Sequence, residues 1–408
     1  MKALVLAGGF PQIALINDLK SRGINVLLAD WNENPVAKKY ADKYYRASTL
    51  DIDAIETIAK QENVDFLITA CTDQALLTVA KVSEKLGLPC YIDYQTALNV
   101  TNKAYMKKVF VENGISTAKH IILSSYNEKA LADMPFPLIV KPVDCNSSKG
   151  VKRVDNLGEL KIALDQAISF SRTKTAVVEQ FIEGPEISVD VYVEDGVAKV
   201  LCVSNNDKIA DKNKFVIFRG VCPAREYDAV KDQVQQTAQQ IADAFGLKNT
   251  PMLIQFIFDG KKVYVLEFSA RTGGGLKYLR IKRMSGFDVI KAVVDLTLGE
   301  KPHVEEYNLG ERYIADEFIY CKPGKYDQLE GFEELKNQGV LTDYYLFKWR
   351  GAMFDTVENS GDRVAGFTIM DTNLNSLKEK HKIVADRIKV LNENGEDIMR
   401  HDLLTELT

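Results

Sequence analysis

VEQFIEGPEISVD, residues 178–190, is the stretch that decides the fold. It reads as a buried strand that enters a short bend at Gly184-Pro185 and continues as a second strand. A strand that ends in such a hinge offers free backbone groups, and the edge of adenine needs one donor and one acceptor. The carbonyl of Gln180 and the amide of Ile182 could supply both, and the carboxylate of Glu186 could accept the two hydroxyls of a ribose. The stretch therefore predicts an adenosine site, although a surface turn with solvated glutamates would have the same residues.

Composition limits the class of protein. A chain of 408 residues is long for one core, so two or three domains are expected. Apolar content of 46% and charged content of 27% are ordinary for a soluble globular enzyme. The net charge of −5 argues against a general nucleic-acid or anionic-membrane binder. The apolar run at residues 3–7 is too short for a signal peptide or a membrane span, so we expect a cytoplasmic protein with neither kind of partner.

The cysteines and histidines are dispersed along the chain. The six cysteines form no C-x-x-C pair, and the four histidines do not cluster. A zinc site, a disulfide framework and a histidine-based triad therefore have little support. We expect reduced thiols and a chemistry that other side chains carry.

Repeated strand and helix patterns fill the first hundred residues. Strands are predicted at residues 4–7, 24–29 and 66–69, and helices at 11–22, 51–62 and 74–86. Units of this length predict a mostly parallel, doubly wound sheet. Gly8-Gly9 and Asp30 resemble half of a dinucleotide site, but the G-x-G-x-x-G fingerprint is missing, so an NAD oxidoreductase is the weaker hypothesis.

The pattern changes after the first hundred residues. A capped helix is predicted at 102–113, a small α+β unit at 118–180, and hairpins around Asp195-Gly196 and Asp259-Gly260. The hairpins indicate an antiparallel sheet. We expect an α/β and α+β chain with a doubly wound domain at 1–113, a lid at 114–184, a larger antiparallel unit at 185–310 and an α+β portion at 311–408. The last portion has a strand near 364–370 and a helix near 374–390.

Two lysines and a polar loop could bind phosphate. Lys141 ends the apolar strand PLIVKP, and Lys103 lies near a predicted helix start; either alone could be a solvated surface lysine. Together they could bracket a triphosphate, because point charges suit diffuse phosphate charge. The small, polar loop at residues 144–150 could fold its amides around phosphate oxygens. Its side-chain donors are Ser147, Ser148 and Lys149.

The run LEFSARTGGG, which ends at Gly275, gives the second strong signal. Counting across the hairpin turn places Gln255 opposite Glu267 or nearly so. Two facing oxygen ligands suit Mg²⁺, which keeps water and phosphate oxygens in its other positions. Ser269 could be a third, weaker ligand, and Arg271 could pair with a transferring phosphoryl group.

Four further residues are candidate substrate contacts. The backbone amides of Gly273 and Gly274 lie open to a carboxylate. Thr72 and Asp73 follow the third predicted strand, and they would face the same cleft if strand carboxyl ends line it. Capping of the following helix is the alternative interpretation.

Taken in order, these segments resemble the ATP-grasp superfamily over roughly residues 1–287. The matching segments are TDQALLTVA, EKLGLP, NKAYMKKVFVENGI, PLIVKP, VEQFIEGPEISVD and LEFSARTGGG. The resemblance implies an ATP-grasp fold, with ATP and Mg²⁺ or Mn²⁺ as cofactors. The ATP contacts it implies are Lys103, Lys141, Ser147, Ser148, Lys149, Glu179, Gln180, Phe181, Ile182 and Glu186. The metal ligands it implies are Gln255, Glu267 and Ser269, where members of the family have Asn at the last position.

The resemblance also implies a reaction class, an ATP-dependent carboxylate–amine ligation. ATP would phosphorylate a carboxylate, and an amine would then displace phosphate from the acyl phosphate. Arg271 and Lys141 would be the catalytic residues, since phosphoryl transfer demands positioning and charge neutralisation. The lid would exclude water from the acyl phosphate. The partners would be a small carboxylate and a small amine, and a homodimer is a family-level expectation.

Two other functions stay open. A purine-biosynthesis ligase acting on a phosphoribosyl amine would need a second phosphate site near the glycine turn. The cations of KYLRIKR, at residues 277–283, could form that site, but they could equally be a solvated helix face. A non-catalytic ATP-binding regulatory module would bind nucleotide without turnover. The tail after residue 311 resembles amino-acid-ligase and carboxylase-like members, without a biotin-attachment sequence.

Overall fold

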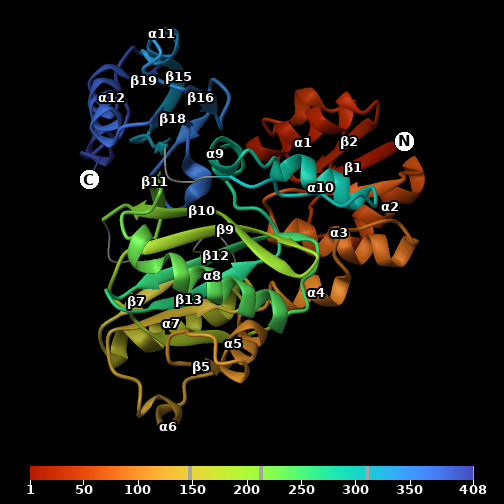
Figure 1. Cartoon of the computed structure of the whole chain (residues 1–408), viewed down its shortest axis with the longest axis vertical. Coiled ribbons are helices and arrows are strands. Elements are labelled where there is room, and N and C mark those ends of the chain that lie inside the picture. The colour runs from red at the N-terminus through yellow and green to blue at the C-terminus, as the bar shows by residue number, and fades with distance from the viewer. Residues whose placement is uncertain (146–148, 211–214, 308–311, 408) are drawn as a thin grey trace.

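The computed structural model describes residues 1–145, 149–210, 215–307 and 312–407. Its elements form four sheets, and Figure 1 shows them grouped around one large central sheet. None of the helices within these ranges is long and apolar enough to cross a membrane. The expected combination of α/β and α+β architecture is confirmed.

The amino-terminal unit is a parallel four-stranded sheet in the order β3-β2-β1-β4. Its strands are β1 (Lys2–Leu6), β2 (Asn25–Asp30), β3 (Lys43–Arg46) and β4 (Phe66–Ile68), and its helices are α1 (Phe10–Ser21), α2 (Ile52–Glu62) and α3 (Asp73–Leu86). Successive residues of β1 join different cores: Ala3 and Val5 pack with α1, whereas Leu4 and Leu6 pack with α2 and α3. The predicted doubly wound sheet is thus confirmed. Short helix α4 (Tyr94–Asn99) and helix α5 (Lys103–Glu112) lead out of this unit.

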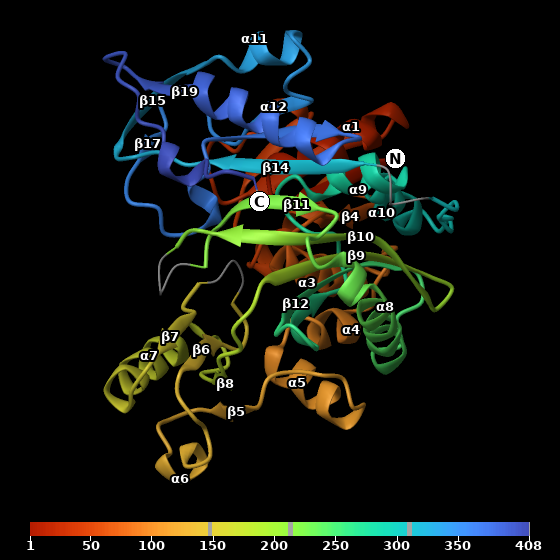
Figure 2. The ribbon, with the colours of Figure 1, turned by 60° about the vertical axis from the view of Figure 1, so that its left-hand side comes forward.

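A small antiparallel sheet follows, in the order β5-β8-β6-β7. Its elements are β5 (His120–Leu123), α6 (Glu128–Leu131), β6 (Leu138–Pro142), β7 (Lys152–Val154), α7 (Leu157–Phe170) and β8 (Ala176–Gln180). Helix α7 buries Leu160, Ala163, Leu164 and Ala167 against one face of the sheet, a spacing that places all four on one side of the helix. Figure 2 shows this unit beneath the central sheet, with α6 and α7 on its outer side.

The central sheet has eight strands in the order β13-β12-β9-β10-β11-β14-β18-β16. From the middle of the chain come β9 (Glu186–Glu194), β10 (Val197–Lys208), β11 (Ile217–Cys222), β12 (Thr250–Phe258) and β13 (Val263–Ser269). Both predicted hairpins are confirmed, and the turn between β9 and β10 has positive φ at Asp195 and Gly196, as a tight hairpin requires. Helices α8 (Tyr227–Ala244), α9 (Lys277–Ser285) and α10 (Val289–Thr297) complete this part.

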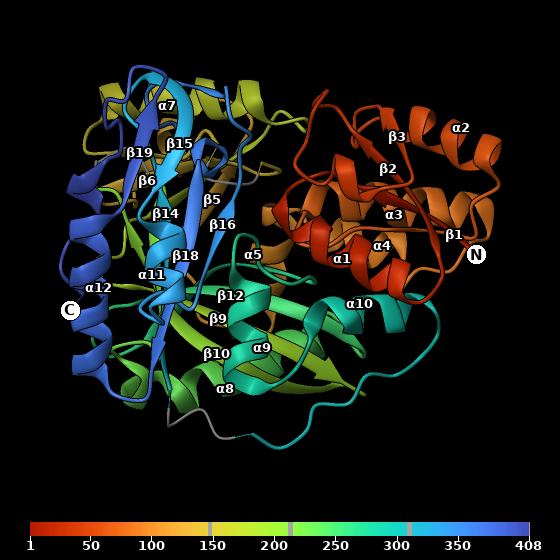
Figure 3. The same cartoon turned by 90° about the horizontal axis from the view of Figure 1, so that it is seen from above.

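The carboxyl-terminal portion continues the central sheet. Strands β14 (Tyr313–Ile319), β16 (Asp343–Leu346) and β18 (Ala365–Asp371) belong to it, while β15 (Gly324–Glu330), β17 (Met353–Phe354) and β19 (Lys389–Asn392) form a small separate sheet. Helices α11 (Phe332–Asn337) and α12 (Leu374–Arg387) flank them. The helix predicted to reach residue 390 ends at Arg387, because Ile388 is extended and the next residues pair with β15. Seen from above, the amino-terminal and carboxyl-terminal portions lie on opposite sides of the molecule (Figure 3).

Candidate active site

Two cavities lie next to each other over one face of the central sheet. The first, of about 140 Å³, is enclosed between β6 and β8 of the small sheet and β12 and β13 of the central sheet. Lys103, Lys141, Glu179, Gln180, Phe181, Ile182, Glu186, Gln255 and Glu267 line it. Its remaining walls include Ile139, Val151, Ile257 and Leu266, so an apolar slot ends in charged groups. The structure therefore brings together most of the residues that the sequence pointed to.

The hinge between β8 and β9 is fixed by close packing. A side chain at Gly184 would put its Cβ only 2.0 Å from the carbonyl oxygen of Phe258, so the bend needs glycine for space. The amide of Phe258 donates to the carbonyl of Pro185, which ties the bend to β12. The amides of Gln180 and Phe181 donate to the carbonyls of Lys119 and Pro137, which directly precede β5 and β6, whereas the amide of Ile182 donates to none of the described residues. That amide remains available for a ligand in the slot.

Glu179 holds two buried lysines. Its carboxylate lies 2.5 Å from Nζ of Lys141 and 3.0 Å from Nζ of Lys107, and its side chain is 3% exposed. Burial alone would raise the pKa of Glu179, but the two ammonium groups outweigh burial and lower it to about 2. The carboxylate is thus bonded to two lysines, and the expected contact of Glu179 with adenine stays a prediction.

Lys107 is a residue that sequence reasoning missed. It is fully buried on α5, four residues after Lys103, so both ammonium groups leave the same face of one helix. Burial lowers the pKa of Lys107 to about 8. The spacing of four residues was the available signal. The ammonium of Lys103 itself lies 3.1 Å from Glu267 and 2.7 Å from the carbonyl oxygen of Cys145.

Glu186 is buried at the start of β9 and held by three donors. Lys208 forms an ion pair with it, and the side-chain amides of Asn206 and Gln255 donate to it over 2.9 and 3.0 Å. Burial would raise the pKa of Glu186, but Lys208 outweighs this effect and the pKa falls below its ordinary value. The group is therefore an oriented carboxylate that stays charged at neutral pH.

The predicted facing pair at the metal position is present. Gln255 and Glu267 are direct cross-strand partners on β12 and β13. Ser269, the third predicted ligand, lies two residues after Glu267 on β13, and its hydroxyl donates to the carboxylate of Asp73. Within the described ranges no group of three or more His, Cys, Asp or Glu side chains could hold a metal. Two facing oxygen donors nevertheless fit Mg²⁺, which takes most of its ligands from phosphate and water.

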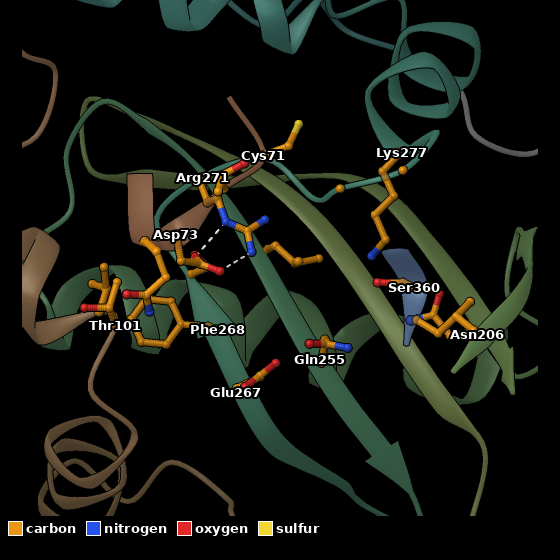
Figure 4. Close-up of a pocket in the computed structure, with 18 of the residues that line it drawn as sticks. Cys71, Asp73, Thr101, Asn206, Gln255, Glu267, Phe268, Arg271, Lys277 and Ser360 are labelled. Atoms are coloured by element: carbon orange, nitrogen blue, oxygen red, sulfur yellow. Dashed lines mark hydrogen bonds and ion pairs between the residues drawn. The ribbon is translucent and has the colours of Figure 1, made fainter. Parts of the chain in front are cut away.

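Asp73 and Arg271 neutralise each other across two parts of the chain. Nε of Arg271 lies 2.6 Å from one carboxylate oxygen of Asp73, and Nη2 contacts the other, as Figure 4 shows. Burial would raise the pKa of Asp73, but Arg271 outweighs it and the pKa is lowered. The pair joins the start of α3 to the end of β13, so neither residue is an unoccupied ligand contact here. Thr72 is the N-cap residue of α3, and its hydroxyl donates to the carbonyl of Ala70 over 3.3 Å.

The second cavity, of about 470 Å³, extends from the metal position toward α9. It is lined by Thr72, Asp73, Lys103, Gln255, Glu267, Ser269, Arg271, Gly274, Gly275, Lys277, Ser360 and Arg363, among others. Figure 4 shows Arg271 with Asp73 on one side of this space and Lys277 with Ser360 and Asn206 on the other. A polar chamber thus adjoins the apolar slot, and Lys103, Gln255 and Glu267 line both.

The sequence predicted that the glycine turn at residues 273–275 offers open backbone amides, but two of its three glycines are needed because neighbouring side chains pack against them. A Cβ at Gly273 would lie 2.2 Å from Cδ of Lys277, and a Cβ at Gly275 would lie 2.9 Å from the ring of Phe318. Only Gly274 has open space, since its nearest neighbour would be 3.8 Å away. Lys277 is 9% exposed, so it is not on a solvated helix face.

The polar-loop residue Lys149 stacks over the ring of Phe170 at 5.2 Å and lines neither cavity, while Ser147 and Ser148 lie outside the described residues.

Comparison with known proteins agrees with this geometry. Residues 134–279 match a family model described as an ATP-grasp domain. A D-alanine–D-alanine ligase of Flavobacterium johnsoniae is 29% identical over 200 residues, which cover 47% of this chain and 61% of that protein. A formate-dependent phosphoribosylglycinamide formyltransferase of Bacteroides thetaiotaomicron is 23% identical over 402 residues, which cover 95% of this chain and 99% of that protein.

Solved structures share the fold over nearly the whole chain. The L-amino acid ligase from Bacillus licheniformis superposes with a TM-score of 0.79 at 20% identity and covers 97% of this chain and 99% of its own. At that identity the likeness shows a common fold. For other curated relatives the chain spans only 17% and 28% of their own length.

Proposed function

Because this chain contains an ATP-grasp domain, we propose that it is an ATP-dependent carboxylate–amine ligase. It would form an amide or peptide bond through an acyl phosphate and release ADP and phosphate. The observation that carries the proposal is the position of the apolar slot. The slot opens onto the facing pair Gln255 and Glu267, and beyond that pair lies a polar chamber of about 470 Å³. A nucleotide in the slot would point its terminal phosphate at whatever fills the chamber.

The nucleotide would bind in three parts. Adenine would lie in the slot between Ile139, Ile257 and Leu266, and the free amide of Ile182 would meet its edge. The oriented carboxylate of Glu186 would accept the ribose hydroxyls. Lys141, which Glu179 holds toward the slot, would contact the phosphates.

We propose that Glu267 and Gln255 hold Mg²⁺. Ser269 would keep its hydrogen bond to Asp73 and would not bind the metal. When bound, Mg²⁺ supplies positive charge that neutralises the phosphate oxygens. Lys103 is at present bonded to Glu267 and would be freed to contact phosphate once that carboxylate serves the metal. Arg271, two residues after the end of β13, would stabilise the transferred phosphoryl group once it leaves its pair with Asp73.

The chamber would take the acid and the amine. Its lining carries Lys277 and Arg363 on the side away from the nucleotide slot, so it favours anionic small molecules. The relatives named above act on small molecules, which is in line with a chamber of this size. We also propose the division at residues 113, 184 and 310, with 114–184 as the lid that covers the acyl phosphate.

Release of ADP with single carboxylates and with carboxylate–amine pairs tests this function. Wild-type protein should form ADP only when Mg²⁺, ATP and a suitable acid are present, and the amide product should appear when an amine is added. Tight binding of MgATP with no turnover for any acid would instead support a regulatory module. Absence of nucleotide binding would refute the proposal altogether.

A purine ligase is a second candidate, and a third cavity favours it. This cavity, of about 580 Å³, adjoins the chamber at Gly275, Ser360 and Arg363 and reaches Gly8-Gly9 at the start of α1. The cations of residues 277–283, which were expected to bind the phosphate of a phosphoribosyl amine, do not line this cavity. Arg280 faces Asp316, and Lys282 binds Asp288. Other lining cations, Lys348, Arg350 and Arg363, replace them. ADP release with phosphoribosylglycinamide and formate, but with no amino acid, would select this candidate.

A further inference from the structure

The ammonium of Lys277 is buried in the chamber without a carboxylate partner. Its one hydrogen bond within the described residues goes to the hydroxyl of Ser188, and no ion pair joins it to any of them. The side chain leaves the first turn of α9 and crosses the chamber toward the central sheet, as Figure 4 shows. An ammonium group has three donors, so donors remain for a ligand.

The position of Lys277 relative to the metal pair follows from strand register. Glu267 on β13 is opposite Gln255 on β12, and Gln255 is opposite Ser188 on β9. Cross-strand partners point to the same face of a sheet, and adjacent strands lie about 4.8 Å apart. The ammonium at Ser188 is therefore roughly 10 Å from Glu267 along one rung, on the same face. This span accommodates a phosphoryl group beside the metal pair and a carboxylate beside Lys277.

Among the described residues, no carboxylate lies at ion-pair distance from the ammonium of Lys277. The groups that face it are Asp190 and Glu186 on β9, Cys202 on β10 and Arg280 on its own helix. Burial lowers the pKa of Lys277, and Arg280 adds to that effect while Asp190 opposes it. Glu186 is already held by Lys208. Asp190, whose two carboxylate oxygens have no hydrogen-bond partner among the described residues, acts on Lys277 from beyond ion-pair distance. A buried cation without a bonded counterion is unfavourable, and an anionic ligand would remove that deficit.

The aliphatic part of the Lys277 side chain is held by its packing against Gly273. The missing side chain of Gly273 leaves the space that Cδ of Lys277 occupies, and a Cβ there would also come within 3.3 Å of Asp190. The ammonium is thus directed along a fixed path from α9 to Ser188. A group held in this way is suited to orienting a ligand.

We propose that Lys277 binds the substrate carboxylate that accepts the phosphoryl group. The proposal rests on the ligase function given above and names a residue that recognises the acid. Lys277 would donate a hydrogen bond to one carboxylate oxygen while the other oxygen attacks the γ-phosphorus of ATP. The bond from that phosphorus to the bridging oxygen breaks, and its electron pair leaves with ADP. No proton is transferred in this step, so atoms and charge balance.

This role makes binding of the acid dependent on pH. The carboxylate needs Lys277 charged, and an uncharged amine must take up a proton when the acid binds. The Michaelis constant for the acid should therefore be flat below the pKa of Lys277 and should rise above it. The Michaelis constant for ATP should not follow the same curve, since Lys277 lines the chamber and not the slot.

The test uses full-length wild type, Lys277→Met, Lys277→Arg and, as a matched control on the same helix, Lys282→Met. Lys282 is exposed and binds Asp288, so its loss should change no kinetic constant. Twenty L-amino acids, acetate and succinate serve as acids, and hydroxylamine traps the acyl phosphate as a hydroxamate. We expect Lys277→Met to raise the Michaelis constant for the acid at least tenfold at pH 7.5, with unchanged MgATP binding by calorimetry. Lys277→Arg should recover part of the loss and shift the rise in the pH profile to higher pH.

The outcomes separate the two claims. If Lys277→Met forms hydroxamate with a wild-type Michaelis constant for the acid, the assignment of Lys277 is wrong while the ligase function stands. An equal loss of MgATP binding in Lys277→Met would also overturn the assignment. If wild-type protein binds MgATP but yields no hydroxamate with any acid, the ligase function and the role of Lys277 in it fail together.

Discussion

Replacing Glu179 by Gln should destabilise the protein strongly, because this carboxylate neutralises Lys107 and Lys141 inside the fold. All three side chains are less than 10% exposed. The pKa of Glu179 falls from 4.5 to about 2 on folding, and the difference corresponds to about 3 kcal/mol of stability. Removal of one partner of a buried ion pair leaves uncompensated charge and typically costs about 3–5 kcal/mol. We therefore expect Glu179→Gln to lose roughly 3–5 kcal/mol of unfolding free energy at pH 7.

The sign of the pH dependence gives a second readout. A carboxylate whose pKa is depressed in the folded state contributes its stability above the unfolded pKa of 4.5, and this contribution is lost as the pH falls toward 2. Wild-type stability should therefore fall across that window, and the fall should be smaller in Glu179→Gln. In the variant, raising the pH toward 9 should recover stability, because Lys107, whose pKa is already lowered to about 8, loses its proton.

Urea unfolding followed by far-ultraviolet circular dichroism measures both effects. Glu183→Gln, an exposed change in the same hinge, is the matched control and should behave as wild type. A loss below about 1 kcal/mol in Glu179→Gln, the range of a surface ion pair, would refute the reasoning.

Four other substitutions test the site. Glu267→Ala should abolish Mg²⁺-dependent ADP formation while the fold persists, and wild-type turnover would remove this residue from the metal position. Glu186→Ala should mainly raise the Michaelis constant for ATP, whereas a loss confined to kcat would contradict a ribose contact. Gly273→Ala should reduce activity at least tenfold by displacing Lys277, a larger loss than in Gly274→Ala, whose Cβ would enter the chamber but would meet no protein atom closer than 3.8 Å. Equal behaviour of the two glycine variants would show that the path of Lys277 does not matter.

Local sequence patterns were sufficient for the elements and for the pairing of strands. Repeated strand and helix patterns predicted the parallel sheet, and Asp195-Gly196 predicted the hairpin that the register confirms. The position of Glu267 opposite Gln255 followed from counting across a turn. These features depend on residues that are close in sequence, so the sequence displays them directly.

Partners between distant elements could not be predicted in the same way. Asp73 and Arg271 are 198 residues apart, and nothing in either segment shows that the two charges meet. Lys277 resembled one member of a solvated basic face, because the helix pattern alone does not tell which side the central sheet covers. Its burial follows from the tertiary packing of α9. Side-chain partners in the site are therefore a property of the assembled fold.

The continuity of the central sheet has a consequence for how the protein can be divided. Strand β11 bonds on one side to β10 and on the other to β14, which belongs to the carboxyl-terminal portion. In a fragment cut after residue 307, the amides and carbonyls of Arg219 to Cys222 would lose their partners on β14. This unpaired strand edge could then pair with the same edge of another molecule. Such a fragment should aggregate even though it contains every nucleotide contact proposed above. Strand β14 of the carboxyl-terminal portion covers this edge of β11. Residues 1–307 and the carboxyl-terminal portion must therefore be produced together.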